Sequence, residues 1–304
     1  MSDSQRRERP ADFVELLGRS AFSFLEASSM PEELVEAAHG LGLGAIALCD
    51  RDGIYGLPRA YAQGKKLGMP VIIGAEVTLD RCWPAGVVAP RRDAPGDPPV
   101  TLALLAEDHT GYGNLCKHLT TAHADHEKGE AGITLGEIAA SAAGLSALLP
   151  LGDALVMATE SAADLDARVG PVREAFGARA ALCTWRRFDG LDRRREAVAH
   201  AAAQRFGLPV VASARPRFHH PSRKPLADVM YCIKHKTTLD AAGTILAANA
   251  EACLRTPTQM RALFRDRPEW VRASLDVADR CRFSLGQLQY AFPSDTLCLP
   301  GESA

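Results

Sequence analysis

The stretch PEELVEAAHGLGLGAIALCDRDGIYGLPRAYAQGKKLGMPVIIGAEVTL, residues 31–79, alternates two hydrophobic patterns and thereby indicates the fold. Residues 31–42 and 56–68 place apolar side chains at helical spacing, whereas 45–49 and 71–77 are short apolar runs typical of strands. Strand–helix alternation of this kind favours parallel strands joined by right-handed crossovers.

The same alternation continues on both sides of this stretch. It predicts seven strands, at Phe13–Leu17, Ala45–Cys49, Val71–Val77, Val100–Ala106, Leu145–Leu151, Ala180–Trp185 and Pro209–Ser213. Further helices are predicted at 110–124, 161–177, 192–207, 223–243, 256–264 and 268–281, and Thr256-Pro257 suits a helix start. The Pro-rich residues 83–99 are expected to form an exposed loop. Seven repeats favour a barrel over an open sheet, with any chemistry at the C-terminal strand ends.

Composition narrows the possible partners and the compartment. The chain has 304 residues, 47% of them hydrophobic, and a net charge of -2, so DNA contact would need a local patch. No apolar run approaches the roughly 18 residues of a membrane span. A soluble cytoplasmic protein without membrane contact is expected, with eight cysteines as free thiols: Cys49, Cys82, Cys116, Cys183, Cys232, Cys253, Cys281 and Cys298.

Several segments carry a family resemblance. They are SAFSFLEASSMPEELVEAAHGLGLGAIALCDRDGIYG (20–56), GAEVTL (74–79), GYGNLCKHLT (111–120), KGEAGITLGEI (128–138), HHPSRKPLADVMYCIKHKTTLDAAG (219–243) and NAEACLRTPTQMRALF (249–264). Together they resemble the PHP (polymerase and histidinol phosphatase) domain of bacterial C-family DNA polymerases, the polymerase III alpha type. The last segment, with CRFSL (281–285), resembles the error-prone, damage-tolerant branch. The resemblance covers about residues 12–300.

The resemblance implies an architecture and a metal site. The fold would be α/β, a distorted seven-stranded (βα) barrel of PHP type with a helical C-terminal extension. Residues 1–11 would form a polar basic tail, 12–243 the barrel, and 244–304 a helical extension and linker toward a polymerase region. Family members bind Zn, Mn or Fe at the C-terminal strand ends through His and carboxylate ligands, which suit these ions.

This sequence departs from the family's ligand pattern. The resemblance implies that most His and Asp ligand positions are replaced, by Leu17, Arg19, Arg51, Arg187, Arg215 and Arg217. Carboxylates remain at Glu26, Asp50 and Glu76. Arginine offers only donors and stays protonated, so it cannot ligate a cation. No metal or other cofactor is therefore expected, and no residue is identified as catalytic.

Two interpretations of the arginines remain open. Paired with the three carboxylates, they would neutralise a polar cavity left by lost metals. Alternatively, the surplus guanidinium groups of Arg19, Arg51, Arg215 and Arg217 would form an anion pocket for phosphate, nucleotide or a DNA backbone.

Other candidate groups favour structural roles. His219 and His220 are expected in a loop or helix start, and the histidines between 109 and 126 on a solvated helix face. Ser20 and Ser23 have no base placed to activate them, so a serine nucleophile is not predicted.

The predicted function is a degenerate, non-catalytic PHP domain of an error-prone DNA polymerase, acting as a scaffold in DNA repair and translesion synthesis. Its partners would be the polymerase catalytic region and damage-tolerance accessory proteins, with DNA met indirectly or by a local patch. One alternative is a metal-dependent PHP phosphoesterase or 3′-5′ exonuclease. Another is a stand-alone anion- or partner-binding protein that uses the arginine cluster.

Overall fold

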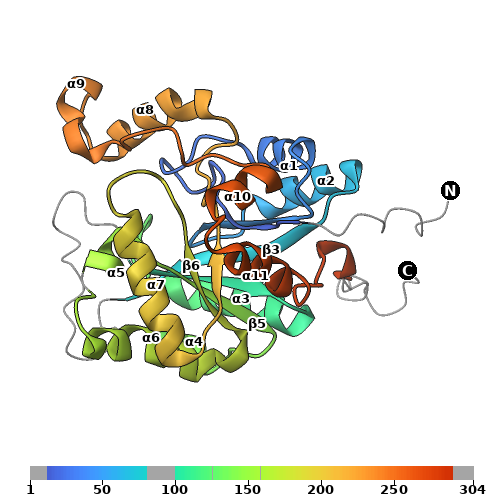
Figure 1. The fold of residues 1–304 in the computed structure, drawn as a ribbon. Coiled ribbons are helices and arrows are strands. Elements are labelled where there is room, and N and C mark those ends of the chain that lie inside the picture. Colours follow the sequence, from blue (N-terminus) through green and yellow to red (C-terminus); the bar gives the residue numbers. More distant parts are fainter. Residues whose placement is uncertain (1–11, 81–99, 125, 158, 290–304) are drawn as a thin grey trace, which may run out of the picture.

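The chain forms one curled seven-stranded sheet with helices packed around it (Figure 1), in a computed structural model that describes residues 12–80, 100–124, 126–157 and 159–289. The strands lie in sequence order across the sheet. They are β1 (Glu15–Gly18), β2 (Ile46–Arg51), β3 (Val71–Thr78), β4 (Thr101–Ala106), β5 (Leu145–Pro150), β6 (Ala180–Thr184) and β7 (Val210–Ala212). The predicted seven-stranded α/β fold is confirmed. The expected tail 1–11, the loop 83–99 and the final linker residues 290–304 lie outside the described residues.

One strand runs against the expected direction. β1 to β3 and β5 to β7 pair in parallel, but β4 is antiparallel to both neighbours, with Thr78 opposite Thr101. The expectation of parallel strands throughout is therefore wrong for β4. A parallel neighbour needs a long crossover, commonly helical, and the Pro-rich sequence before β4 has no helical pattern. The reversal brings the start of β4 to the rim where β3 ends.

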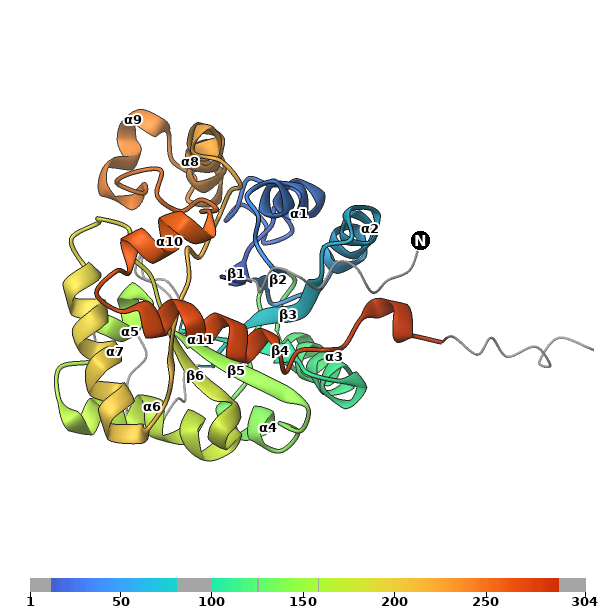
Figure 2. The same cartoon turned by 45° about the vertical axis from the view of Figure 1, so that its right-hand side comes forward.

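The helices cover the outside of the sheet and both of its ends (Figures 1 and 2). They are α1 (Pro31–Gly40), α2 (Leu57–Leu67), α3 (His109–Ala124), α4 (Leu135–Ala139), α5 (Asp153–Met157), α6 (Ala162–Phe176), α7 (Asp192–Phe206), α8 (Lys224–Lys234), α9 (Leu239–Ala242), α10 (Pro257–Leu263) and α11 (Pro268–Ala278). Short 3-10 helices are η1 (Gly177–Arg179), η2 (Pro221–Arg223), η3 (Gly243–Ile245) and η4 (Leu285–Gln287).

Most predicted helices are present, with two kinds of difference. The short helices α4 and α5 were not predicted, because five residues are too few to show a helical period. The helix predicted over 223–243 is interrupted: Lys236 adopts a left-handed conformation (φ 51°) and Thr238 caps α9 by accepting from Ala241 N–H. The predicted start at Thr256 is confirmed, since its side chain accepts from Gln259 N–H at 3.1 Å.

Two apolar cores lie on opposite faces of the sheet. In β2, Ile46 and Leu48 pack outward under the helices, whereas Ala47 and Cys49 face the inside of the curl. The inner core consists largely of small side chains, because a closed or curled sheet leaves a narrow interior. Ala273 and Val277 of α11 complete this inner core.

The seam between the edge strands β1 and β7 is bridged by a side chain. Glu15 accepts hydrogen bonds from the Ser213 hydroxyl and from Ala214 N–H at 2.8 Å, both just after β7. α11 packs against β7 and β1 on the same side, where Val14 N–H donates to the Ser274 hydroxyl at 3.2 Å. Glu15 and α11 therefore occupy the position that strand pairing would take in a closed barrel.

No helix in the described part of the chain is long and apolar enough to cross a bilayer. The six cysteines of this part are free thiols, as predicted, and all but Cys116 are buried. Cys82 and Cys298 lie outside the described residues.

Candidate functional site

Glu76 lies at the centre of a charged cluster on the rim formed by the C-terminal strand ends. It is 1% exposed, and Arg19, which follows β1, pairs with its Oε2 atom. Arg215, which follows β7, pairs with Oε1 at 2.6 Å, and the Thr101 hydroxyl donates to the same atom. Burial by itself would raise the pKa of Glu76, but Arg19 and Arg215 hold this pKa well below its usual range. Glu76 is therefore a charged carboxylate with both oxygens occupied.

Glu26 forms the second anionic point of the same cluster. Its Oε2 atom lies 2.7 Å from Arg19 Nη1 and 3.3 Å from Arg51 Nη2, and its Oε1 atom lies 2.5 Å from Lys234 Nζ. Burial would raise the pKa of Glu26, but Arg51, Arg19 and Lys234 together lower it to about 2. Glu26 is therefore a second charged carboxylate, held by three cationic side chains.

Asp50 lies in the same region but has neutral partners. At the end of β2, it accepts from Ser20 N–H at 2.7 Å and from the hydroxyls of Ser20 and Ser23 at 2.7 and 2.8 Å. Burial raises the pKa of Asp50 despite these hydrogen bonds. Both serines thus donate to a buried carboxylate.

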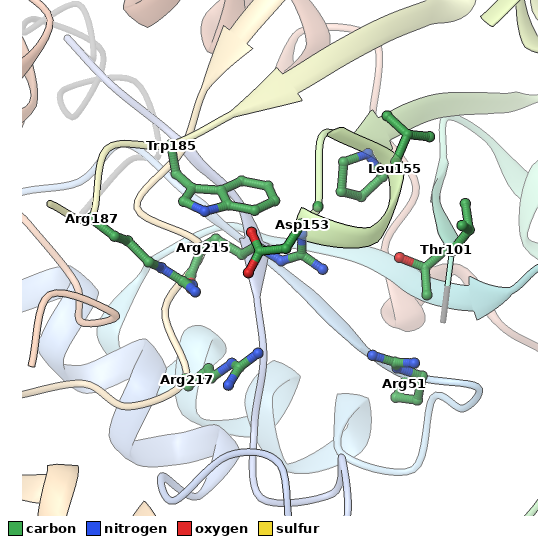
Figure 3. Close-up of a pocket in the computed structure, with 11 residues that line it drawn as sticks. Arg51, Thr101, Asp153, Leu155, Trp185, Arg187, Arg215 and Arg217 are labelled. Atoms are coloured by element: carbon green, nitrogen blue, oxygen red, sulfur yellow. The ribbon is translucent and has the colours of Figure 1, made fainter. Parts of the chain in front are cut away.

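Arg187 and Arg215 lie beside Trp185, whereas Arg51 and Arg217 lie further from its ring, as Figure 3 shows. The guanidinium carbon of Arg215 lies 4.3 Å from the centre of the indole ring, and that of Arg187 lies 5.5 Å from it. Arg187 also donates to the backbone oxygen of Arg215 at 2.7 Å. Arg51, Arg187, Arg215 and Arg217 line a cavity of about 60 Å³, which we call the arginine pocket.

These side chains do not fit the metal cluster that the resemblance implies. Leu17 is part of the inner apolar core and has no ligand atom. The oxygens of Glu76 and Glu26 contact guanidinium or ammonium groups, and those of Asp50 contact hydroxyl and amide donors. Across the described residues, no three His, Cys, Asp or Glu side chains come together as a potential metal site.

Three of the candidate histidines have identifiable structural roles. His220 caps η2 by accepting from Ser222 N–H at 3.2 Å, as expected for a helix start, and His219 contacts the Ser29 hydroxyl at 2.8 Å. The solvated face expected for residues 109–126 is wrong for His118, which is 2% exposed and contacts the backbone oxygen of Ser141 at 3.1 Å.

Sequence reasoning missed four residues of the site, Thr101, Asp153, Trp185 and Lys234. Thr101 reaches the rim only because β4 is antiparallel. Lys234 reaches Glu26 because α8 lies above the rim, 208 residues further along the chain. Trp185 carried a detectable signal, since it ends a predicted strand and directly precedes the two arginines of TWRRF.

Comparisons with known proteins identify the family of this chain. The family model described as "PHP domain" matches residues 16–182. Error-prone DNA polymerases of Anaeromyxobacter dehalogenans strain 2CP-1 and Brucella abortus are 39% and 34% identical to this chain over 92% and 96% of its length. The chain spans only 23% and 25% of those relatives, about a quarter of their length.

Among solved structures, a metal-dependent phosphoesterase of Bifidobacterium adolescentis matches with a TM-score of 0.47 and 18% identity, covering 69% of this chain and 89% of that one. The predicted resemblance to the PHP region of error-prone polymerases is confirmed by the family model and the sequence relatives. On these grounds the chain belongs to the PHP domain family.

Proposed function

We propose that this PHP domain holds no catalytic metal and serves as a structural scaffold for the polymerase region of an error-prone DNA polymerase, in the context of repair and translesion synthesis. The role would place it in the cytoplasm, with DNA met through the polymerase region. The observation that carries the proposal is the pairing of Glu76 with Arg19 and Arg215. Two fixed positive charges take up the carboxylate that a metal cluster would need.

The chemistry of the rim supports the absence of catalysis. A PHP-type hydrolysis needs ligands that leave an open coordination position for an activated water. Arginine supplies neither a ligand atom nor, at accessible pH, a general base. The two serines near the site donate to Asp50 and have no histidine or lysine within hydrogen-bonding distance in the described structure.

An exposed apolar stripe on α8 supports the scaffold role. Leu226, Val229 and Ile233 are 39–60% exposed and lie at helical spacing along one side of the helix. Exposed apolar patches of this kind commonly mark interaction sites. The occupant we propose is the polymerase region, because the relatives are about four times as long as this chain.

Elemental analysis of the purified chain, expressed with added zinc, manganese and iron, tests the metal claim. We expect far less than one ion per chain. A matched positive control carries Leu17→His, Arg19→His, Arg51→His, Arg215→Asp and Arg217→His, which restore the ligand types that the resemblance implies, and should retain metal. Stoichiometric metal in the wild type, lost in Glu76→Ala, would instead favour the phosphoesterase or exonuclease alternative.

The proposed contact between α8 and the polymerase region needs a separate measurement. The chain is mixed with the separately expressed polymerase region of the Anaeromyxobacter dehalogenans relative, and association is followed by sedimentation. Ile233→Asp should weaken association about 10-fold or more, because a charge is placed in an apolar contact. Met157→Asp, a matched change at an exposed residue of α5, should leave it unchanged. Equal binding by the wild type, Ile233→Asp and Met157→Asp would argue against α8 as the contact.

A further inference from the structure

The arginine pocket contains more positive charge than its acidic neighbours balance. Among the described residues that line it, Asp153 is the one acidic side chain, against four arginines. Asp153 also pairs with Arg195, which lies outside the lining, at 3.0 Å. Figure 3 shows the Asp153 carboxylate between the arginines of the pocket.

The four arginines fall into two pairs with different surroundings. Arg215 pairs with Glu76 at 2.6 Å and Arg51 with Glu26 at 3.3 Å. Arg187 and Arg217, in contrast, form no ion pair with any carboxylate of the described residues.

The pKa shifts agree with this imbalance. Burial lowers the pKa of Arg187 and of Arg217, and neighbouring guanidinium groups lower both further, although Asp153 acts in the opposite direction on Arg187 and Glu26 on Arg217. Both groups nevertheless stay charged at neutral pH, because an arginine pKa begins so high. They are therefore held close together against mutual repulsion.

A buried donor in the lining also lacks an acceptor. The Trp185 side chain is 2% exposed, and its Nε1 atom has no hydrogen-bond partner in the described structure. The guanidinium of Arg215 stacked on the ring limits its rotation. Figure 3 places the indole nitrogen on the side of the ring that faces Arg187. Native proteins rarely leave such a group unsatisfied, so an acceptor is expected in the pocket.

We propose that the arginine pocket binds the phosphate group of a phosphate monoester, without metal, through Arg187, Arg217 and the Trp185 N–H, with Arg51 and Arg215 adding charge. A cavity of about 60 Å³ exceeds the roughly 10–15 Å³ that one water needs and suits one tetrahedral oxyanion. Arginine forks match phosphate oxygens in geometry. Arg19 does not line this pocket, because its guanidinium contacts Glu76 and Glu26.

The monoester is favoured because a larger cavity adjoins the pocket. This cavity, of about 580 Å³, shares Asp153, Arg187 and Arg217 with the arginine pocket and is also lined by Tyr231 and Leu246. A phosphate held by the shared arginines would leave the organic part of the ligand beside these apolar and aromatic side chains.

The inference rests on the proposed absence of catalytic metal, because a bound cation would itself attract phosphate. The test therefore follows binding to the EDTA-treated chain by calorimetry and tryptophan fluorescence, at constant ionic strength. Inorganic phosphate and dAMP are the probes, and deoxyadenosine is the control without phosphate. We expect phosphate and dAMP to bind and deoxyadenosine not to bind. At least 10-fold tighter binding of dAMP identifies a monoester, and equal affinity identifies free phosphate.

Arg217→Gln should weaken binding about 10-fold or more, because a charge-assisted hydrogen bond is lost. Without phosphate, this variant should melt no lower than the wild type, since a repelling charge is removed. The exposed Arg193→Gln on α7 is the charge-matched control and should bind normally. Unchanged binding of phosphate and dAMP by Arg217→Gln would overturn the proposal. The absence of any binding to the wild type at constant ionic strength would overturn it as well. Binding that disappears with EDTA and returns with zinc or manganese would overturn both the pocket and the metal-free function.

Discussion

Glu15 and Glu76 are equally buried inside the same sheet, at 0% and 1% exposure, but they have opposite surroundings. Glu15 bridges the seam between β1 and β7 and accepts from neutral donors, including Leu17 N–H at 2.9 Å and Ala214 N–H at 2.8 Å. Burial raises its pKa. Glu76 contacts two guanidinium groups, which keep its pKa low.

The difference teaches that the partners of a buried carboxylate decide in which direction its pKa moves, because the two side chains are equally buried. Glu15 accepts its hydrogen bonds from neutral donors and acts as a structural link. Glu76 must stay ionised to balance Arg19 and Arg215. Glu15 therefore links two strands, whereas Glu76 is the anionic centre of the rim.

The largest expected effect is that of Glu76→Gln. The change leaves Arg19 and Arg215 buried without their shared counter-charge, so it should reduce the free energy of unfolding by about 3–5 kcal/mol. Urea unfolding followed by circular dichroism at neutral pH measures this. A loss below about 1 kcal/mol would mean that the two arginines find other partners.

The second prediction concerns acid. Glu26 and Glu76 have pKa values lowered by folding, so their contribution is complete above the unfolded value near 4.3 and disappears as pH falls through the folded value. For Glu26, with a folded pKa of about 2, this amounts to about 3 kcal/mol lost between about pH 5 and 2. Glu15 and Asp50, with raised pKa values, oppose part of this loss.

Urea midpoints measured from pH 7 to pH 3 should therefore fall with acid in the wild type and fall less steeply in Glu76→Gln. Parallel curves for the two proteins would show that folding does not lower the pKa of Glu76.

Glu15→Gln is the matched change at the other carboxylate and should have a smaller effect. The amide keeps one acceptor oxygen, but its NH₂ group meets a hydrogen-bond donor across the seam. We expect a loss of about 1 kcal/mol in the same urea assay. A loss as large as that of Glu76→Gln would show that neutral and cationic partners stabilise a buried carboxylate equally, which would remove the contrast between the two sites.

The smallest effect is expected for Lys234→Met. Lys234 is 38% exposed, so its ion pair with Glu26 is screened by solvent and should contribute between about 0 and 1 kcal/mol. In added salt, the free energies of unfolding of the wild type and of Lys234→Met should be nearly equal. A larger loss would indicate that α8 is held on the rim mainly by this pair.

Sequence patterns were sufficient to predict the strands and most long helices. Burial on one face of an element makes apolar residues recur with a period that the local sequence displays. The patterns were insufficient for the direction of β4, because a short apolar run reads the same in a parallel and in an antiparallel strand. They also placed all the arginines in one cluster, whereas in the structure Arg19 pairs with Glu76 and Glu26, and Arg187 and Arg217 form no ion pair within the described residues.

The sequence by itself determined the strand–helix alternation, the family resemblance and the presence of arginines where the resemblance implies metal ligands. Only the tertiary structure decided which guanidinium meets which carboxylate. Arg19 and Arg215 reach Glu76 from 57 and 139 residues away. The strength of an ion pair depends on distance and burial, which folding sets and which the spacing of residues along the chain does not encode.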